Sequence, residues 1–198
     1  LERVLNVLWN TAVFLKTYGS KRPKKAVPLA EDRWILSRVN SLVGEVTGNL
    51  EAFNFHLAGR ALGDFILNDF SRWYIKIIRD RVSPSYKGKD KAAAQRALEH
   101  VLEQVVRLMA PFTPFVSEKI YLDLFRSKES VHLEAWPKAE KQVIDRALEE
   151  GMVVVKGLVE AMNSLRQEKK ANLRWPIDKA FVQLDNPRNL RGLDEVVE

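Results

Sequence analysis

The sequence contains no cysteine among its 198 residues, which excludes disulfide bonds, thiol nucleophiles and thiolate metal sites. It also lacks any run of about 18 uncharged apolar residues, so we expect no membrane-spanning helix and no membrane partner. The opening stretch, LERVLNVLWN, has no signal-peptide layout and begins in helical register without an initiator methionine. These absences favour a cytoplasmic protein and a chain that is a piece of a longer one.

Sequence motifs of catalysis are scarce as well. The three histidines, His56, His100 and His132, lie far apart and fall in different predicted elements, which argues against a shared metal site. The sequence holds no glycine-rich phosphate loop and no Gly-x-Ser-x-Gly motif. We therefore expect no catalytic residue, metal or cofactor in this chain. An unrecognised enzyme is an alternative, and it would need a pocket with convergent polar groups.

What the sequence does have is basic charge. It carries 32 Lys and Arg residues against 26 Asp and Glu residues, a net charge of +6. Such an excess favours a nucleic acid or another polyanion as partner without locating a site. The hydrophobic fraction of 46% is ordinary for a globular protein, and the length is sufficient for one sizeable core.

Helical periodicity dominates the apolar pattern. The first helix has one apolar face, formed by Leu1, Val4, Leu5, Leu8, Ala12 and Leu15. Further helices are predicted at about 30–50, 55–82, 90–110, 114–125 and 142–169. Asn54 is the expected N-cap of the third helix, and Thr113 that of the fifth, with Pro114 at the first helical position. The inner face of the third helix should consist of Ala58, Leu62, Phe65, Ile66, Phe70, Trp73 and Ile77.

Strand-like patterns appear only late in the chain. SVHLEAWP alternates apolar and polar residues and predicts a short extended segment. KAFVQL predicts a strand, and a turn and a possible helix follow it. Because one unpaired strand is not stable alone, this α/β unit should be incomplete. We predict a mainly α fold, with a helix bundle at 1–140 and, at 141–198, a long helix plus the start of a small α/β unit.

Two basic clusters stand beside aromatic residues. On the third predicted helix Arg72, Lys76 and Arg79 follow the spacing of one stripe, which Arg81 would extend. The simpler interpretation is that Trp73 belongs to the core, Tyr74 lies at its boundary and the stripe is a solvated face. The second cluster, Arg166, Lys169, Lys170 and Arg174, ends the last long helix, where cations also favour the helix dipole.

Taken in order, six segments resemble the anticodon-binding region of class I aminoacyl-tRNA synthetases, in the subgroup that acts on branched aliphatic amino acids. They are LWNTAVFL, DRWILSRVNSLV, FNFHLAGRALGDFILNDFSRWYIKIIRDR, RLMAPFTPFVSEKIY, ESVHLEAWP and ANLRWPI. The resemblance covers about residues 1–185. ESVHLEAWP, followed by a long helix and LRWPI, is most similar to isoleucyl enzymes of the archaeal or eukaryote-like type. The valyl enzymes are the closest competitor.

The resemblance implies a parent enzyme that activates isoleucine with ATP and Mg²⁺ and transfers it to tRNA(Ile). The catalytic motifs of that family are not in this chain, so the resemblance implies a non-catalytic module. Its partners would be the anticodon stem-loop of tRNA(Ile) and the remaining domains of the parent. The implied tRNA-binding residues are Asn6, Trp9, Asn10, Arg72, Trp73, Lys76, Arg79, Arg81, Arg174 and Trp175. A helical protein-interaction bundle is the alternative from another class.

Overall fold

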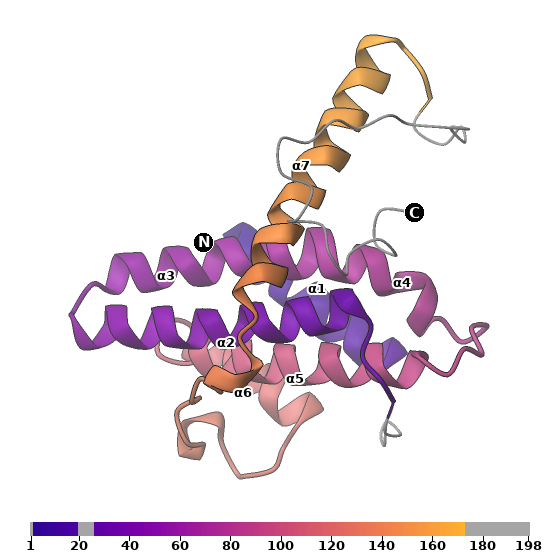
Figure 1. Cartoon of the computed structure of the whole chain (residues 1–198). Coiled ribbons are helices and arrows are strands. Elements are labelled where there is room, and N and C mark those ends of the chain that lie inside the picture. Colours follow the sequence, from indigo (N-terminus) through magenta and orange to yellow (C-terminus); the bar gives the residue numbers. More distant parts are fainter. Residues whose placement is uncertain (1, 20–25, 173–198) are drawn as a thin grey trace. The chain divides into compact units, whose positions relative to one another are not determined.

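The computed structural model describes residues 2–19 and 26–172 of the chain (Figure 1). The chain divides into two compact units, Leu1–Ile144 and Asp145–Glu198. The described part of both units is helical and contains no strand. Within that part, no helix is long and apolar enough to cross a membrane.

The predicted helices of the first unit are confirmed, with small changes at their ends. They are α1 (Glu2–Tyr18), α2 (Ala30–Glu51), α3 (Phe55–Asp64), α4 (Lys76–Val82), α5 (Lys91–Met109) and α6 (Pro114–Leu124). A π-helical segment, η1 (Phe65–Ile75), joins α3 to α4. Two short 3₁₀ turns, η2 (Val131–Leu133) and η3 (Lys141–Val143), follow α6. Asn54 and Thr113 stand at the expected N-cap positions, but neither side chain makes a capping hydrogen bond.

The core of the first unit lies between long helices that run side by side (Figure 1). The helix pair formed by α2 and α3 packs on α5, while α1 lies against η1, α5 and α6. Trp34 of α2, Phe65 and Phe70 of η1, and Leu98 of α5 are almost fully buried there. Burying one large apolar side chain contributes roughly 1.5–3 kcal/mol to stability. This shared core therefore holds the helices of the first unit together.

The π-helical segment changes which residues of the third predicted helix face inward. Each π turn closes an i→i+5 hydrogen bond and therefore holds more residues than an α turn. From Tyr74, near the end of η1, the inward positions fall one residue later than an α-helical pattern predicts. Tyr74 and Ile78 are fully buried, while Trp73 and Ile77 are only partly buried. The predicted inner face was right as far as Phe70 and wrong at Trp73 and Ile77.

The predicted extended segment in SVHLEAWP was also wrong. The Ser130 hydroxyl accepts a hydrogen bond from the His132 N–H at 3.2 Å, which closes the turn η2. The Glu118 carboxylate accepts hydrogen bonds from the Ser130 hydroxyl at 3.0 Å and from the Val131 N–H at 2.8 Å. Side chains thus take the place that a neighbouring strand would have.

The described part of the second unit is α7 (Arg146–Glu168) and the residues up to 172. The Asp145 carboxylate accepts a hydrogen bond from the Leu148 N–H at 3.0 Å, the usual N-cap arrangement. This cap explains why the last long helix begins at Arg146 rather than near 142. The predicted strand at 179–184 and the possible helix after it lie outside the described residues.

Candidate nucleic-acid interface

The exposed face of α1 carries polar and aromatic side chains. Leu8, Ala12 and Leu15 are buried and fix the inward side of the helix. Asn6 and Asn10 are therefore exposed, and Trp9 keeps 42% of its surface open to solvent. Amide groups can hydrogen-bond to base edges, and an open indole can stack on an unpaired base. These three predicted site residues are thus available to a ligand from one side of α1.

The basic residues of η1 and α4 form the second part of the candidate surface. Arg72, Lys76 and Arg79 are exposed. Arg72 donates a hydrogen bond to Asn68 Oδ1 at 3.1 Å, which orients its guanidinium along the helix. Lys76 and Arg79 continue along the third predicted helix, beyond η1. Exposed cations of this kind attract phosphates in a salt-dependent way.

The two parts belong to neighbouring helices. α1 packs along η1, and a Cβ atom placed on Gly63 would lie 3.5 Å from Val4 Cγ2. The small residue before η1 therefore allows α1 to approach closely. Trp73 is only half-buried, because the π register turns Tyr74 inward in its place. The fold thus brings Asn6, Trp9 and Asn10 onto the helix next to the one that carries Arg72 and Trp73.

Arg81 has a different environment, and this corrects the expectation that it extends the exposed stripe. Its side chain is only 12% exposed. Its Nε donates to Asp90 at 2.8 Å, its Nη2 donates to Asp32 at 2.9 Å, and its Nη1 donates to Glu31. We call Glu31, Asp32, Tyr74, Arg81 and Asp90 the Arg81 cluster. It connects the start of α2, the end of α4 and the start of α5.

The electrostatics of the Arg81 cluster show that it acts as one structural group. Burial alone would lower the pKa of Arg81, but hydrogen bonds and charge from Asp32 and Glu31 outweigh burial and raise it. Burial and the Asp32 carboxylate raise the pKa of Tyr74 well above its usual value. Arg81 is therefore always a cation, and Tyr74 stays a neutral hydrogen-bond donor. Each guanidinium nitrogen already faces an oxygen atom, so we leave Arg81 out of the candidate RNA surface.

Arg174 and Trp175, the last two predicted site residues, lie outside the described residues.

Sequence reasoning also missed an ion pair that holds η1 against α2. Arg38 donates to Asp69 Oδ2 from Nε at 3.2 Å and from Nη2 at 3.1 Å. The two residues stand 31 positions apart, and no short-range pattern connects them. Among the described residues, no group of three His, Asp or Glu side chains could hold a metal ion.

The comparisons with known proteins define the class of protein. The family described as "Anticodon-binding domain of tRNA ligase" matches residues 32–181. The chain belongs to this family. A crystal structure of a ternary complex of Agrobacterium radiobacter K84 LeuRS, tRNA and LeuAMS is similar over 73% of this chain and 16% of that chain. Its TM-score is 0.50 at 24% sequence identity, so this likeness shows the fold alone, a helical bundle.

The similar curated proteins are more specific. The isoleucine–tRNA ligases of Methanopyrus kandleri and Thermococcus kodakarensis each share 40% sequence identity with this chain, in alignments that cover 99% of it. The enzyme of Pyrococcus abyssi is 41% identical over 94% of it. The chain spans about a fifth of these relatives, 19% for the first two and 18% for the third. These relatives favour the isoleucyl over the valyl resemblance.

Proposed function

We propose that this chain binds the anticodon stem-loop of tRNA(Ile) and positions that tRNA for a catalytic domain elsewhere in an isoleucine–tRNA ligase. Family membership supports the tRNA part of the proposal. The names of the similar proteins support the isoleucine part. The parent would use ATP and Mg²⁺ to activate isoleucine and would act in the cytoplasm. We assign no step of that chemistry to residues of this chain.

The single observation that carries the proposal is the outward face of α1 beside η1. An anticodon loop presents unstacked bases, which proteins recognise by aromatic stacking and by hydrogen bonds to base edges. Trp9, Asn6 and Asn10 offer both kinds of group from a rigid helix. The stem presents phosphates, and Arg72, Lys76 and Arg79 supply cations for them. We propose that Trp73 lines the boundary between the two contact types, and that Arg174 and Trp175 also take part in tRNA binding.

The test compares variants of α1 in a tRNA(Ile) binding titration. Stacking of one base on an aromatic side chain is worth about 1–3 kcal/mol, so Trp9→Ala should weaken binding roughly tenfold or more. The matched control is Trp136→Ala. Trp136 is not one of the proposed tRNA-binding residues, and its Nε1 donates to Thr47 Oγ1 at 2.9 Å. Equal affinity of the Trp9 variant and the wild type, with folding intact by circular dichroism, would contradict the proposal.

A further inference from the structure

The two ends of the helix bundle in the first unit differ in chemistry. The Arg81 cluster marks one end, where α2 and α5 begin and α4 finishes. From there α2 and α5 run side by side, so the α2–α3 turn and the break between α5 and α6 lie at the opposite end (Figure 1). A Cβ atom placed on Gly59 would lie 3.6 Å from Phe112 Cε1. The start of α3 therefore lies beside the break that precedes α6.

Phenylalanine side chains are open to solvent at this opposite end. Phe53 is 79% exposed, Phe55 55% and Phe115 89%, while Phe112 is partly buried. The ring centroids of Phe53 and Phe55 are 6.0 Å apart in an edge-to-face arrangement. Phe55 and Gly59 stand one turn apart on α3, so Phe55 lies on the side of α3 that faces Phe112. We call these four phenylalanines the phenylalanine patch.

The phenylalanine patch lies on segments without positive charge. Residues 39–59 and 108–118 contain no Lys or Arg, although the chain has 32 of these residues. The exposed cations proposed to contact RNA, Arg72, Lys76 and Arg79, lie towards the Arg81 end of the bundle. Proteins that stack unpaired bases on aromatic side chains also supply cations for the phosphates. Aromatic side chains without charges are instead typical of the centre of a protein–protein interface.

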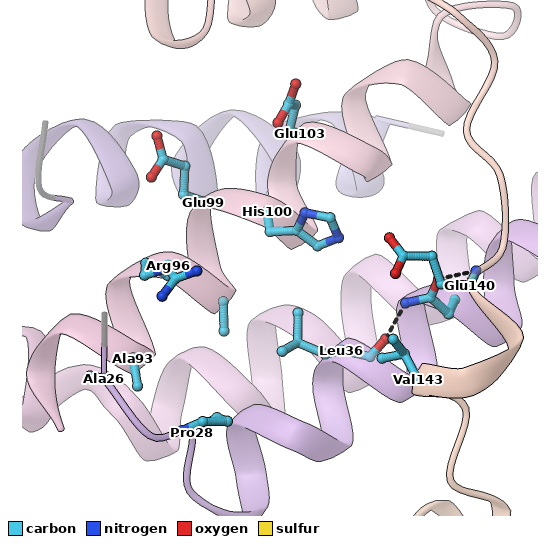
Figure 2. A pocket seen from close by; sticks show the side chains of 12 residues that line it. Ala26, Pro28, Leu36, Ala93, Arg96, Glu99, His100, Glu103, Glu140 and Val143 are labelled. Atoms are coloured by element: carbon cyan, nitrogen blue, oxygen red, sulfur yellow. Dashed lines mark hydrogen bonds between the residues drawn. The ribbon is translucent and has the colours of Figure 1, made fainter. Parts of the chain in front are cut away.

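A cavity of about 470 Å³ between α2 and α5 is a weaker candidate for a binding site (Figure 2). Figure 2 shows Arg96, Glu99, His100 and Glu103 on α5, with Glu140 on the segment that leads into η3. The lining thus combines an exposed guanidinium with three carboxylates. Charges of both signs select no single class of ligand, whereas the phenylalanine patch is apolar throughout.

We propose that the phenylalanine patch docks on an apolar protein surface in the part of the isoleucine–tRNA ligase polypeptide that lies outside this chain. The inference rests on the proposed function, because it takes the chain to be one part of such a ligase. The chain spans 19% of the relatives from Methanopyrus kandleri and Thermococcus kodakarensis. Most of a ligase of that length is therefore available to supply the partner surface.

The size of the patch favours a contact within one polypeptide over a contact between two copies. The exposed fractions of Phe53, Phe55 and Phe115 correspond to roughly 450 Å², at about 200 Å² for a whole side chain. A stable interface between separate chains buries about 800 Å² on each partner. Interfaces between domains of one chain begin at about 600 Å² in total, because the covalent connection keeps the two surfaces at a high effective concentration.

Hydroxyl-radical footprinting tests the proposal without any variant. The oxidation of individual side chains is compared between the 198-residue chain and the full-length ligase that contains it. Phe55 and Phe115 should be oxidised at least threefold more slowly in the ligase, whereas Trp9 should react equally in both. Equal oxidation of the two phenylalanines in chain and ligase would overturn the proposal.

The same measurement separates the other occupants and the tRNA function. Addition of tRNA(Ile) to the 198-residue chain should protect Trp9 and leave Phe55 and Phe115 reactive. Protection of the phenylalanines by tRNA would assign the patch to RNA, and protection that grows with the concentration of the chain would assign it to a second copy. Either result would overturn the docking proposal. A reactive Trp9 in the presence of tRNA would contradict the proposed function instead.

Variants of the ligase test what the contact does. Phe55→Ser with Phe115→Ser changes two exposed side chains, so the helices should stay intact. Transfer of isoleucine to tRNA(Ile) should fall roughly tenfold or more, since a misplacement of about 1 Å can cost 100-fold. Isoleucine-dependent exchange of pyrophosphate with ATP should stay unchanged, and so should tRNA binding by the 198-residue chain with the same two changes.

The matched control is Val27→Ser. Val27 is an exposed apolar residue just before α2, at the Arg81 end of the bundle, and its replacement should leave transfer, exchange and tRNA binding unchanged. A double variant of Phe55 and Phe115 that transfers isoleucine as fast as the wild type, or a control variant that is equally impaired, would overturn the proposal.

Discussion

The Tyr74 hydroxyl donates a hydrogen bond of 2.8 Å to Asp32 Oδ1, across 42 residues of sequence and inside the core. Asp32 also accepts hydrogen bonds from Arg81 Nη2 at 2.9 Å and from the Leu29 N–H at 3.0 Å. One carboxylate thus links the start of α2 to η1 and to α4. Since α4 carries Arg79 close to Arg81, this buried link also holds part of the candidate RNA surface in place.

Replacing Tyr74 by phenylalanine should destabilise the bundle. The change removes a buried donor to a carboxylate, and hydrogen bonds to charged groups contribute about 1.5–3 kcal/mol. We expect a loss of that size in the free energy of unfolding, measured by urea denaturation. Tyr18→Phe is the control, because Tyr18 lies at the end of α1 and is only half-buried. An equal loss in both variants would show that the Asp32 bond adds nothing specific.

The arginines of the third predicted helix should divide into two groups. Arg72→Ala and Arg79→Ala remove exposed cations, so they should weaken tRNA binding and lower its salt dependence while stability stays nearly constant. Arg81→Met leaves three carboxylates without their partner and should cost about 3–5 kcal/mol of stability. Urea denaturation and tRNA titration of all three variants check this division. A stable Arg81 variant with reduced tRNA affinity would return Arg81 to the RNA surface.

The turn between α2 and α3 contains a strained residue. Phe53 has a φ angle of 59°, and the Asn54 and Phe53 N–H groups donate to the Asn49 and Leu50 carbonyls at 2.8 and 3.0 Å. This is the Schellman arrangement, which usually places glycine where Phe53 stands. Phe53→Gly should therefore raise the free energy of unfolding by about 1 kcal/mol, because it relieves backbone strain, and the melting temperature should rise with it. Phe53→Ala, which keeps the strain, should give no gain. A lower melting temperature for the glycine variant would show that the exposed Phe53 ring contributes more to stability than the backbone strain costs.

His100 should make the bundle sensitive to mild acid. Burial lowers its pKa in the folded chain, whereas the unfolded chain binds the proton near the usual pKa of about 6.5. The unfolded state therefore takes up more protons in the window below about pH 6.5, and stability falls as the pH falls through it. His100→Gln should lose less stability than the wild type between pH 7 and pH 5.5, by urea denaturation at both values. His56→Gln, which changes an exposed histidine, should behave as the wild type does.

Much of the fold could be predicted from the sequence because helices leave a local periodic signal. The apolar spacing in α1, α2 and α5 marks their buried faces directly, and Pro111 and Pro114 mark the break before α6. The π-helical register of η1, which packs against α1 and α2, left no such signal. For this reason the sequence predicted Trp73 as the inward residue, whereas the structure buries Tyr74.

The candidate site was less predictable than the fold. Exposure of Asn6, Asn10 and Arg72 follows from helical spacing alone, and the structure agrees with it. The buried state of Arg81 does not follow, because its partners Glu31 and Asp32 stand about 50 residues earlier in the chain. The cavity beside His100 could not be predicted either. It is lined by Ala93 and Ala97 of α5 and Leu36 of α2, which are far apart in the sequence.

The most direct test of the central claim is a binding titration of this chain against three tRNAs at two salt concentrations. The tRNAs are the isoleucine and valine tRNAs and one unrelated tRNA. Base recognition through the α1 face predicts preferential binding of tRNA(Ile) that persists at the higher salt, because stacking and base-edge contacts depend little on counterions. Equal binding of all three tRNAs that disappears at the higher salt would contradict the claim and leave the chain with phosphate attraction alone.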